Sequence, residues 1–135
     1  MPTTRQYHAR KATGLCSKCN NVVIPGKTRC EEHNLYHNQH TKNDRIRNKI
    51  QAINAYGGKC TCCGESEISV LNIDHVNNDG AEHRREIGLG SCRLYQWLKH
   101  HNYPDGYQVL CANCNTSKAI LGECFHKIGD TNANN

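Results

Sequence analysis

The sequence predicts a small α+β fold that depends on zinc. The 135 residues include ten cysteines and nine histidines, and most of the cysteines stand in Cys-x2-Cys or Cys-x2-His pairs, the spacing of zinc ligands. Only 36% of the residues are hydrophobic, which is little for a self-sufficient core. Bound metal would supply the missing stability. Short strand patterns and helix patterns alternate between these pairs.

The first predicted element is a zinc finger within residues 1–40. Three thiolates and one imidazole form a closed ligand set, and the segment between the two pairs predicts a short ribbon with a turn at Pro25-Gly26. His37 and His40 are alternative fourth ligands, but His33 repeats the Cys-x2-Cys spacing. The predicted ligands are Cys16, Cys19, Cys30 and His33.

Residues 41–58 predict a basic helix that links two zinc modules. Three isoleucines fall on one helical face, Ile46, Ile50 and Ile53. Asn43 or Asp44 can cap its start, and Gly57-Gly58 can end it. The basic side chains project away from the apolar face, and we expect them to bind DNA: Arg45, Arg47 and Lys49.

The charge is unevenly distributed along the chain. Residues 1–59 carry 11 Lys and Arg against 3 Asp and Glu, a net charge of +8, whereas residues 60–135 carry 6 against 9, a net charge of -3. A basic half beside an acidic half indicates that one part contacts phosphates and the other holds metal. The alternative is a solvated basic tail.

Two further knuckles lie in the second module, residues 59–128. Their four thiolates are the ligand set of a closed structural zinc site: Cys60, Cys63, Cys111 and Cys114. Gly64 favours this frame because positive φ is common after the second cysteine of a knuckle; a Cys60/Cys62 pairing is the alternative. Disulfides are a second alternative, but the chain shows no signal peptide.

Two strands and two helices complete the second module. Ile68–Ile73 predicts a strand that leads into Asp74-His75, and Tyr107–Leu110 predicts a second strand before the last knuckle. A helix then follows, with Asn115 at or near its N-terminus. Ser91–His101 predicts an inserted amphipathic helix in which Trp97 is the packing anchor. Residues 129–135 predict a flexible tail.

Asp74, His75 and Asn115 offer oxygen and nitrogen ligands rather than sulfur. Such groups suit a hard or borderline cation that keeps open positions for substrate. The sequence therefore predicts a second kind of metal site beside the closed zinc sites.

Residues 56–126 resemble the HNH endonucleases, particularly the zinc-stabilised phage type. The motifs that carry the resemblance are Tyr56-Gly-Gly-Lys-Cys60-x2-Cys63-Gly64, Ile73-Asp74-His75 and Leu110-Cys111-x2-Cys114-Asn115. It implies a ββα-metal, treble-clef-like core that hydrolyses DNA phosphodiester bonds, with His75 as general base. Asp74 and Asn115 would hold one catalytic Mg²⁺, Mn²⁺ or Zn²⁺. Two structural Zn²⁺ would accompany it, one in the nuclease core and one in the accessory N-terminal finger. Double-strand cleavage would call for a homodimer or for two sequential events.

The chain departs from the family pattern at one position. Gly106 stands where the family has its middle Asn, and Asn77, Asn78 and Asn102 are out of frame. His83, Arg84 and Arg85, in a predicted loop, are candidates for phosphate contact, with His83 as an extra metal ligand; a solvated loop is the alternative. The remaining cysteines and histidines are taken as ordinary thiols and as surface or core imidazoles: Cys62, Cys92, Cys124, His100, His101 and His126.

The function predicted from the sequence is a divalent-metal-dependent HNH endonuclease acting on DNA. The alternatives are a non-catalytic zinc-containing DNA-binding protein or regulator and, less favoured by the basic half, a protein-interaction adaptor. The chain contains no run of ~18 apolar residues, so no membrane span is predicted. It also does not open with an apolar segment. We therefore expect the cytoplasm of a bacterial or phage-infected cell.

Overall fold

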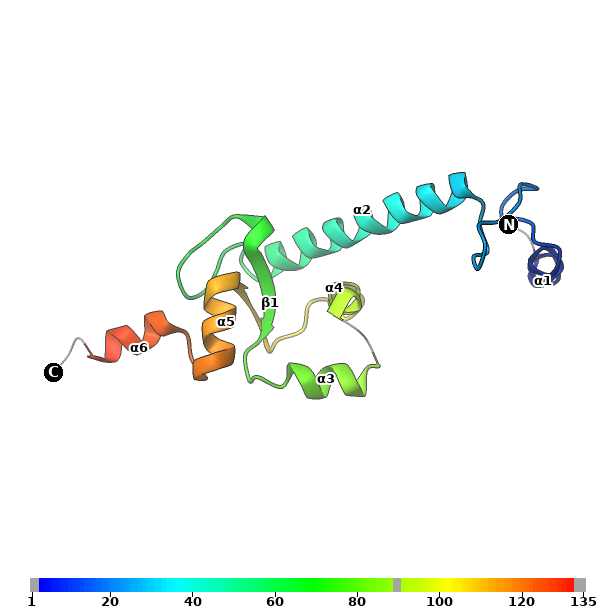
Figure 1. Cartoon of the computed structure of the whole chain (residues 1–135). Helices are drawn as coiled ribbons and strands as arrows, with labels where there is room; N and C mark the ends of the chain where they lie inside the picture. Colours follow the sequence, from blue (N-terminus) through cyan, green and yellow to red (C-terminus); the bar gives the residue numbers. More distant parts are fainter. Residues whose placement is uncertain (1–2, 89–90, 133–135) are drawn as a thin grey trace. The chain divides into compact units, whose positions relative to one another are not determined.

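The computed structural model describes residues 3–88 and 91–132. It separates into two compact units, Met1–Asp44 and Arg45–Asn135. The described residues form a small α+β structure with six α-helices and one two-stranded sheet (Figure 1).

The first unit begins with a helix that the sequence analysis did not predict, α1 (Thr4–Ala12). Its start is a capping box: the Thr3 hydroxyl accepts a hydrogen bond from the Gln6 amide, and the Gln6 side chain accepts one from the Thr3 amide at 2.9 Å. The predicted ribbon is reduced to one bridge, Leu15 with Val22. Its turn forms as expected, with Gly26 at φ +77°.

The long helix α2 (Glu31–Ala55) begins well before the predicted start at Asn43 or Asp44. That prediction was wrong because the amide of Asn34 already bonds the carbonyl of Cys30 at 2.9 Å. Glu31 and Glu32 also place negative charge at the positive end of the helix dipole. The end was predicted correctly: Gly57 and Gly58 have positive φ and close the helix.

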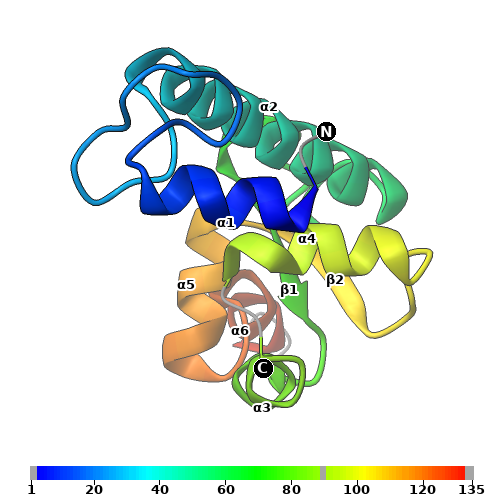
Figure 2. The ribbon, with the colours of Figure 1, turned by 90° about the vertical axis from the view of Figure 1, so that its right-hand side faces the viewer.

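The second unit is built on an antiparallel hairpin. Strand β1 (Leu71–His75) pairs with β2 (Tyr107–Cys111), from Leu71 opposite Cys111 to His75 opposite Tyr107. The first strand is shorter than predicted, because Ile68–Val70 forms a 3-10 turn. Helices α5 (Ala112–Leu121) and α4 (Ser91–His100) lie on opposite sides of the hairpin (Figures 1 and 2).

Side chains along β1 alternate between these two sides. Leu71, Ile73 and His75 are buried, whereas Asn72 and Asp74 are half-buried. The apolar core of this unit also includes residues from the end of α2, from α4 and from β2: Ala52, Ile53, Leu98, Val109 and Leu110. Trp97 packs against that core, as predicted for an anchor.

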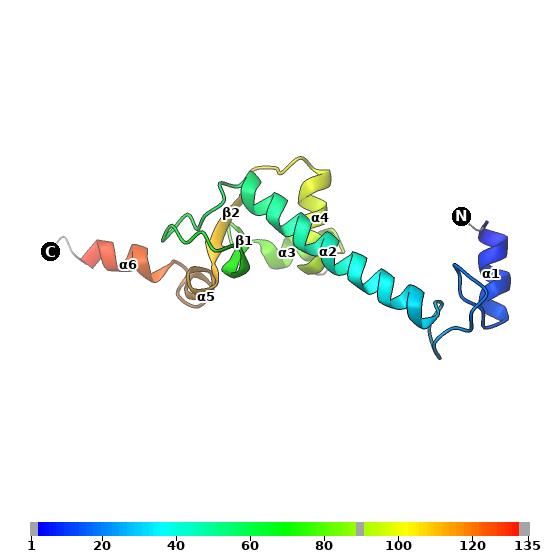
Figure 3. The ribbon, with the colours of Figure 1, turned by 90° about the horizontal axis from the view of Figure 1, so that it is seen from above.

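Two further helices correct the sequence analysis. Residues 81–86 are not a loop, since they belong to α3 (Gly80–Glu86). The predicted flexible tail is helical as far as Asn132, within α6 (Phe125–Asn132). Gly122, at φ +82°, ends α5 in the left-handed conformation and redirects the chain into α6 (Figure 3). Among the described helices, none combines the length and apolar character needed to cross a bilayer.

Candidate metal centres and active site

Three groups of described Cys and His side chains could each hold a zinc ion, with the ligand atoms of each group within 4.8 Å of one another. A tetrahedral zinc site with Zn–S near 2.3 Å and Zn–N near 2.0 Å requires S···S distances of about 3.8 Å and S···N distances of about 3.5 Å. Each group can be compared with these values. The nine described cysteines are all free thiols, so the disulfide alternative is wrong for them.

The N-terminal group contains the four predicted residues, Cys16, Cys19, Cys30 and His33. The Nδ1 atom of His33 lies 3.7, 3.4 and 3.3 Å from the three sulfurs, and the sulfurs of Cys19 and Cys30 are 3.7 Å apart. These values match a tetrahedral zinc site. His33 therefore takes the fourth position, rather than His37 or His40.

Backbone hydrogen bonds favour the thiolate of Cys16. Burial raises the pKa of Cys16, but hydrogen bonds from the backbone at Cys30, Lys18 and Cys19 outweigh burial and bring the pKa down to about 6. Because the thiolate is the metal-binding form, this cysteine is prepared for zinc.

The second group contains Cys60, Cys63, Cys111 and Cys114, again the predicted set. The sulfurs of Cys63 and Cys111 are 3.7 Å apart, the tetrahedral value and far beyond the 2.0 Å of a disulfide. Burial raises the pKa of Cys60, and backbone hydrogen bonds at Cys63, Cys111 and Cys62 lower it to about 6. Cys111 is also the N-cap of α5, where its sulfur accepts from the Cys114 amide at 3.4 Å.

The third group was missed. Cys62, Cys124 and His126, taken from the sequence as ordinary residues, gather around Cys114. The prediction failed because Cys62 and His126 are far apart in the chain and become neighbours only when the start of α6 lies beside the first knuckle. The doubled Cys62-Cys63 and the Cys124-x-His126 spacing were the available signals. The side chain of Cys92 lies outside the described residues.

His75 is held in a ring of aromatic and imidazole groups on the α4 side of the hairpin. Its Nε2 lies 3.1 Å from Nδ1 of His83, and its ring centroid lies 4.7 Å from that of Tyr107. On the other side Gly80 approaches so closely that an added Cβ would lie 2.8 Å from His75 Nδ1. His75 is thus only 8% exposed. These contacts orient its ring.

Burial lowers the pKa of His75, and the positive charges of His83 and Arg84 act in the same direction. Asp79 and Asp74 oppose this shift, but they do not reverse it. A lowered pKa keeps the imidazole neutral at physiological pH, which is the form that accepts a proton.

His83 lies deeper than a solvated loop residue. Its Nδ1 is also 3.3 Å from the Tyr107 hydroxyl, its ring meets Trp97 edge-on at 4.5 Å, and its Nε2 is buried without a partner among the described residues. His75 and His83 line a cavity of about 180 Å³ whose lining also includes four acidic residues: Asp79, Glu82, Glu86 and Asp105.

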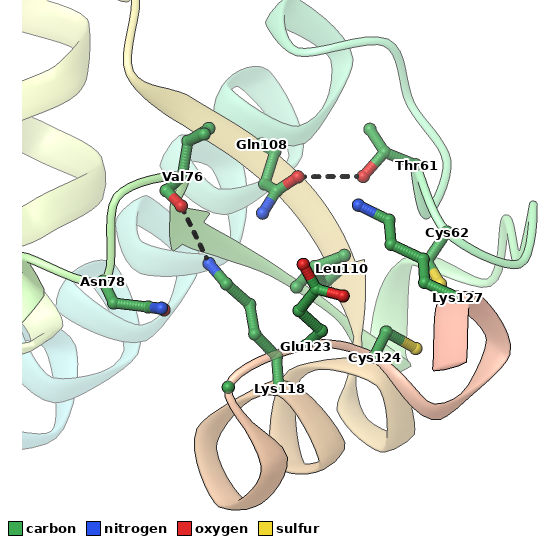
Figure 4. A pocket seen from close by; sticks show the side chains of 11 residues that line it. Thr61, Cys62, Val76, Asn78, Gln108, Leu110, Lys118, Glu123, Cys124 and Lys127 are labelled. Atoms are coloured by element: carbon green, nitrogen blue, oxygen red, sulfur yellow. Dashed lines mark hydrogen bonds between the residues drawn. The ribbon is translucent and has the colours of Figure 1, made fainter. Parts of the chain in front are cut away.

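Asp74 points to the opposite side of the hairpin, toward α5. Its Oδ2 accepts hydrogen bonds from Lys118 Nζ at 2.5 Å and from Gln108 Nε2 at 2.8 Å. Lys118 also donates to the carbonyls of His75 and Val76, and it extends across a cavity of about 270 Å³ (Figure 4). In this structure an ammonium group neutralises the carboxylate predicted to bind the catalytic ion.

Asn115 lies in the first part of α5, as predicted, one turn before Lys118. It borders a cavity of about 460 Å³ together with Asn72 of β1 and the predicted DNA-binding residues Arg45 and Lys49. Arg84 lines the same cavity. Three basic residues thus share the lining of this cavity with Asn115, whereas Asp74 is not among the residues that line it.

The other predicted contacts are less closely associated with this cavity. Arg47 and Arg85 are exposed, and Arg85 donates to the Ala81 carbonyl within its own helix. His101 stacks on Trp97 at 4.0 Å, and both His100 and His101 are exposed, which is one of the two environments predicted for them, surface or core.

The chain was compared with family models, curated proteins and solved structures, and none of them gives a significant match.

Proposed function

We propose that this protein is a metal-dependent endonuclease of the HNH type that hydrolyses phosphodiester bonds in DNA. The observation that carries the proposal is the placement of His75. It ends the first strand of a β-hairpin whose second strand leads through Cys111 into a helix, the ββα order that the resemblance implies. There its ring is held between His83, Tyr107 and Gly80, and its pKa is lowered.

In the proposed reaction His75 accepts the proton of the attacking water. Because His75 and Asp74 face opposite sides of the hairpin, the reaction requires the end of β1 to turn so that both side chains reach the same phosphate. His83 is a positioning residue, because its Nδ1 lies within hydrogen-bonding distance of His75 Nε2. This contact would open to give water access to Nε2 of His75, and when it closes again the proton would pass from His75 Nε2 to His83 Nδ1. A positioned base contributes roughly 10²–10⁴-fold to a rate.

The catalytic ion would be held by Asp74 and Asn115, with water and phosphate completing its coordination. One carboxylate and one amide are few protein ligands. Such an open site suits Mg²⁺ or Mn²⁺, which keep several waters, better than an ion that takes all its ligands from the protein. When bound, the ion would stabilise charge on the phosphate and on the leaving 3′ oxygen. Because Lys118 pairs with Asp74, binding requires Lys118 to move aside, and its ammonium then becomes free to contact phosphate.

The cavity around Asn115 supports the choice of a nucleic acid as substrate. Arg45, Lys49 and Arg84 place three positive charges at its edge, beside apolar surface from Ile46, Leu94 and Tyr95. Replacing the three basic residues by Ala should weaken DNA binding and reduce the slope of log K against log salt by up to about 3. An Arg5/Arg10/Lys11 variant, which changes the same number of charges on α1, is the matched control.

The decisive experiment is metal-dependent nicking of plasmid DNA. His75→Ala should retain zinc and DNA affinity and lose cleavage by roughly 10²-fold or more. Asp74→Ala should lose cleavage in a way that higher Mg²⁺ or Mn²⁺ partly restores. Cleavage by His75→Ala at the wild-type rate would refute the assignment of the base.

A second candidate is a non-catalytic zinc-containing DNA-binding protein. The specific observation in its favour is the Asp74–Lys118 ion pair, which satisfies the carboxylate without any metal. This candidate predicts that the wild-type protein shifts a DNA probe but never nicks it, whatever divalent ion is supplied.

A further inference from the structure

We propose that the second unit holds a binuclear zinc centre, in which the thiolate of Cys114 bridges two ions. One ion has the ligands Cys60, Cys63, Cys111 and Cys114. The other is bound by Cys62, Cys114, Cys124 and His126. With the N-terminal finger, the chain then binds three structural zinc ions.

The distances in the third group support a metal centre. The Nδ1 atom of His126 lies 3.6, 3.5 and 3.3 Å from the sulfurs of Cys62, Cys114 and Cys124. A tetrahedral zinc ion requires about 3.5 Å. The N-terminal group, whose sequence spacing already identified it, shows 3.7, 3.4 and 3.3 Å. The two groups share one geometry.

Hydrogen bonding does not account for three sulfurs around one nitrogen. Nδ1 of a neutral imidazole carries either one proton or one lone pair, so it can make one good hydrogen bond. A cation at the centre of the four ligand atoms explains the convergence. Three thiolates and one imidazole in a tetrahedral arrangement favour zinc over the hard ions Mg²⁺ and Ca²⁺.

Cys114 can serve both ions because of its position. It is fully buried in the first turn of α5, and its sulfur belongs to both groups of ligands. Cys62 stands between Cys60 and Cys63 in the chain but contributes to the other group. The knuckle therefore supplies ligands to two ions from one turn.

The charge balance permits the second ion. A single zinc with four thiolates carries a net charge of -2, and two zinc ions with six thiolates and a neutral imidazole also carry -2. The additional ion replaces the two thiol protons of Cys62 and Cys124, so its binding releases protons without adding charge to the interior.

The second ion would fix α6 to the rest of the unit. The turn at Gly122 and a hydrogen bond from the Phe125 amide to Ser117 Oγ at 2.9 Å bring Cys124 beside the first knuckle. Figure 4 shows Cys62 and Cys124 close to each other at one end of the cavity crossed by Lys118. Removing the ion should therefore loosen α6 first.

Metal stoichiometry tests the proposal. Full-length protein, loaded with zinc and freed of excess by gel filtration, should carry three zinc ions by native mass spectrometry. Cys62→Ser, Cys124→Ser and His126→Ala should each carry two, with faster hydrogen exchange in α6, whereas the control Cys92→Ser should keep three. Two ions in the wild type, or three in all of these variants, would overturn the proposal.

The bridging sulfur has its own test, which needs no variant. Protein loaded with ¹¹³Cd should give three resonances, and two of them should be coupled to each other through the sulfur of Cys114. Three uncoupled resonances would show that the ions do not share a thiolate, and the binuclear centre would be refuted. Neither test depends on nuclease activity, so failure here leaves the proposed function standing.

Discussion

Gly80→Ala is the sharpest probe of how His75 is held. An added Cβ would lie 2.8 Å from Nδ1 and 3.2 Å from Cε1 of His75, whereas ordinary contacts begin near 3.4 Å. The imidazole would have to move by at least about 0.6 Å, away from Gly80 and against His83 and Tyr107. Overpacking of this kind costs about 1–3 kcal/mol. Alanine has a higher helix propensity than glycine, so the substitution also stabilises the helix by up to about 1 kcal/mol.

The net expectation for Gly80→Ala is a loss of about 0–3 kcal/mol in the free energy of unfolding, centred on about 1.5 kcal/mol. Gly129→Ala is the matched control, because Gly129 is also helical and an added Cβ meets nothing within 4 Å. It should be neutral or more stable by up to about 1 kcal/mol. Denaturant unfolding of zinc-loaded protein measures both. Equal stability of the two variants, with unchanged His75 NMR shifts in Gly80→Ala, would refute this placement of His75.

Three further predictions concern charge and metal. Lys118→Met should leave Asp74 without its ammonium partner and so strengthen Mn²⁺ binding at that carboxylate, measured by calorimetry; unchanged affinity would show that the ion pair does not compete with metal. NMR titration should place the pKa of His75 below 6.5. The variant His83→Asn should raise this pKa, since a positive charge on His83 disfavours protonation of His75. The stability that His75 contributes is then complete above pH 6.5 and declines as the pH falls toward the folded-state pKa. Exhaustive chelation should unfold the second unit, and retention of its circular dichroism would contradict a structural role for zinc.

The sequence predicted what depends on local spacing. The Cys-x2-Cys and Cys-x2-His pairs identified two ligand groups, and the apolar run Tyr107–Leu110 identified β2. Elements whose limits depend on longer-range or weaker signals were misjudged. The helix α2 continues back to Glu31, and the candidate ligands Cys30 and His33 lie at its N-terminus, so zinc binding there would involve the residues that begin the helix.

The environment of His75 could not be predicted for a similar reason. His83 reaches it only because residues 80–86 fold as a helix, and nothing in that short charged segment indicates a buried imidazole. The partnership of Lys118 with Asp74 likewise requires α5 to lie along β1. Contacts between residues more than 40 positions apart in the chain are set by the packing of these elements rather than by any local pattern.

The hairpin register connects the zinc centre to the proposed active site. Cys111, a candidate zinc ligand, pairs with Leu71 at one end, and Tyr107 pairs with His75 at the other, about 13 Å away at 3.3–3.4 Å per residue. A slip of one residue would turn His75 toward α5 and Asp74 toward α4. Because Cys111 belongs to a group that could hold zinc and also caps α5, a bound zinc ion would fix this register and the position of Asn115 and Lys118 beside β1. Structural ions would thus determine which face of the hairpin presents the carboxylate and which presents the proposed base, without contacting either.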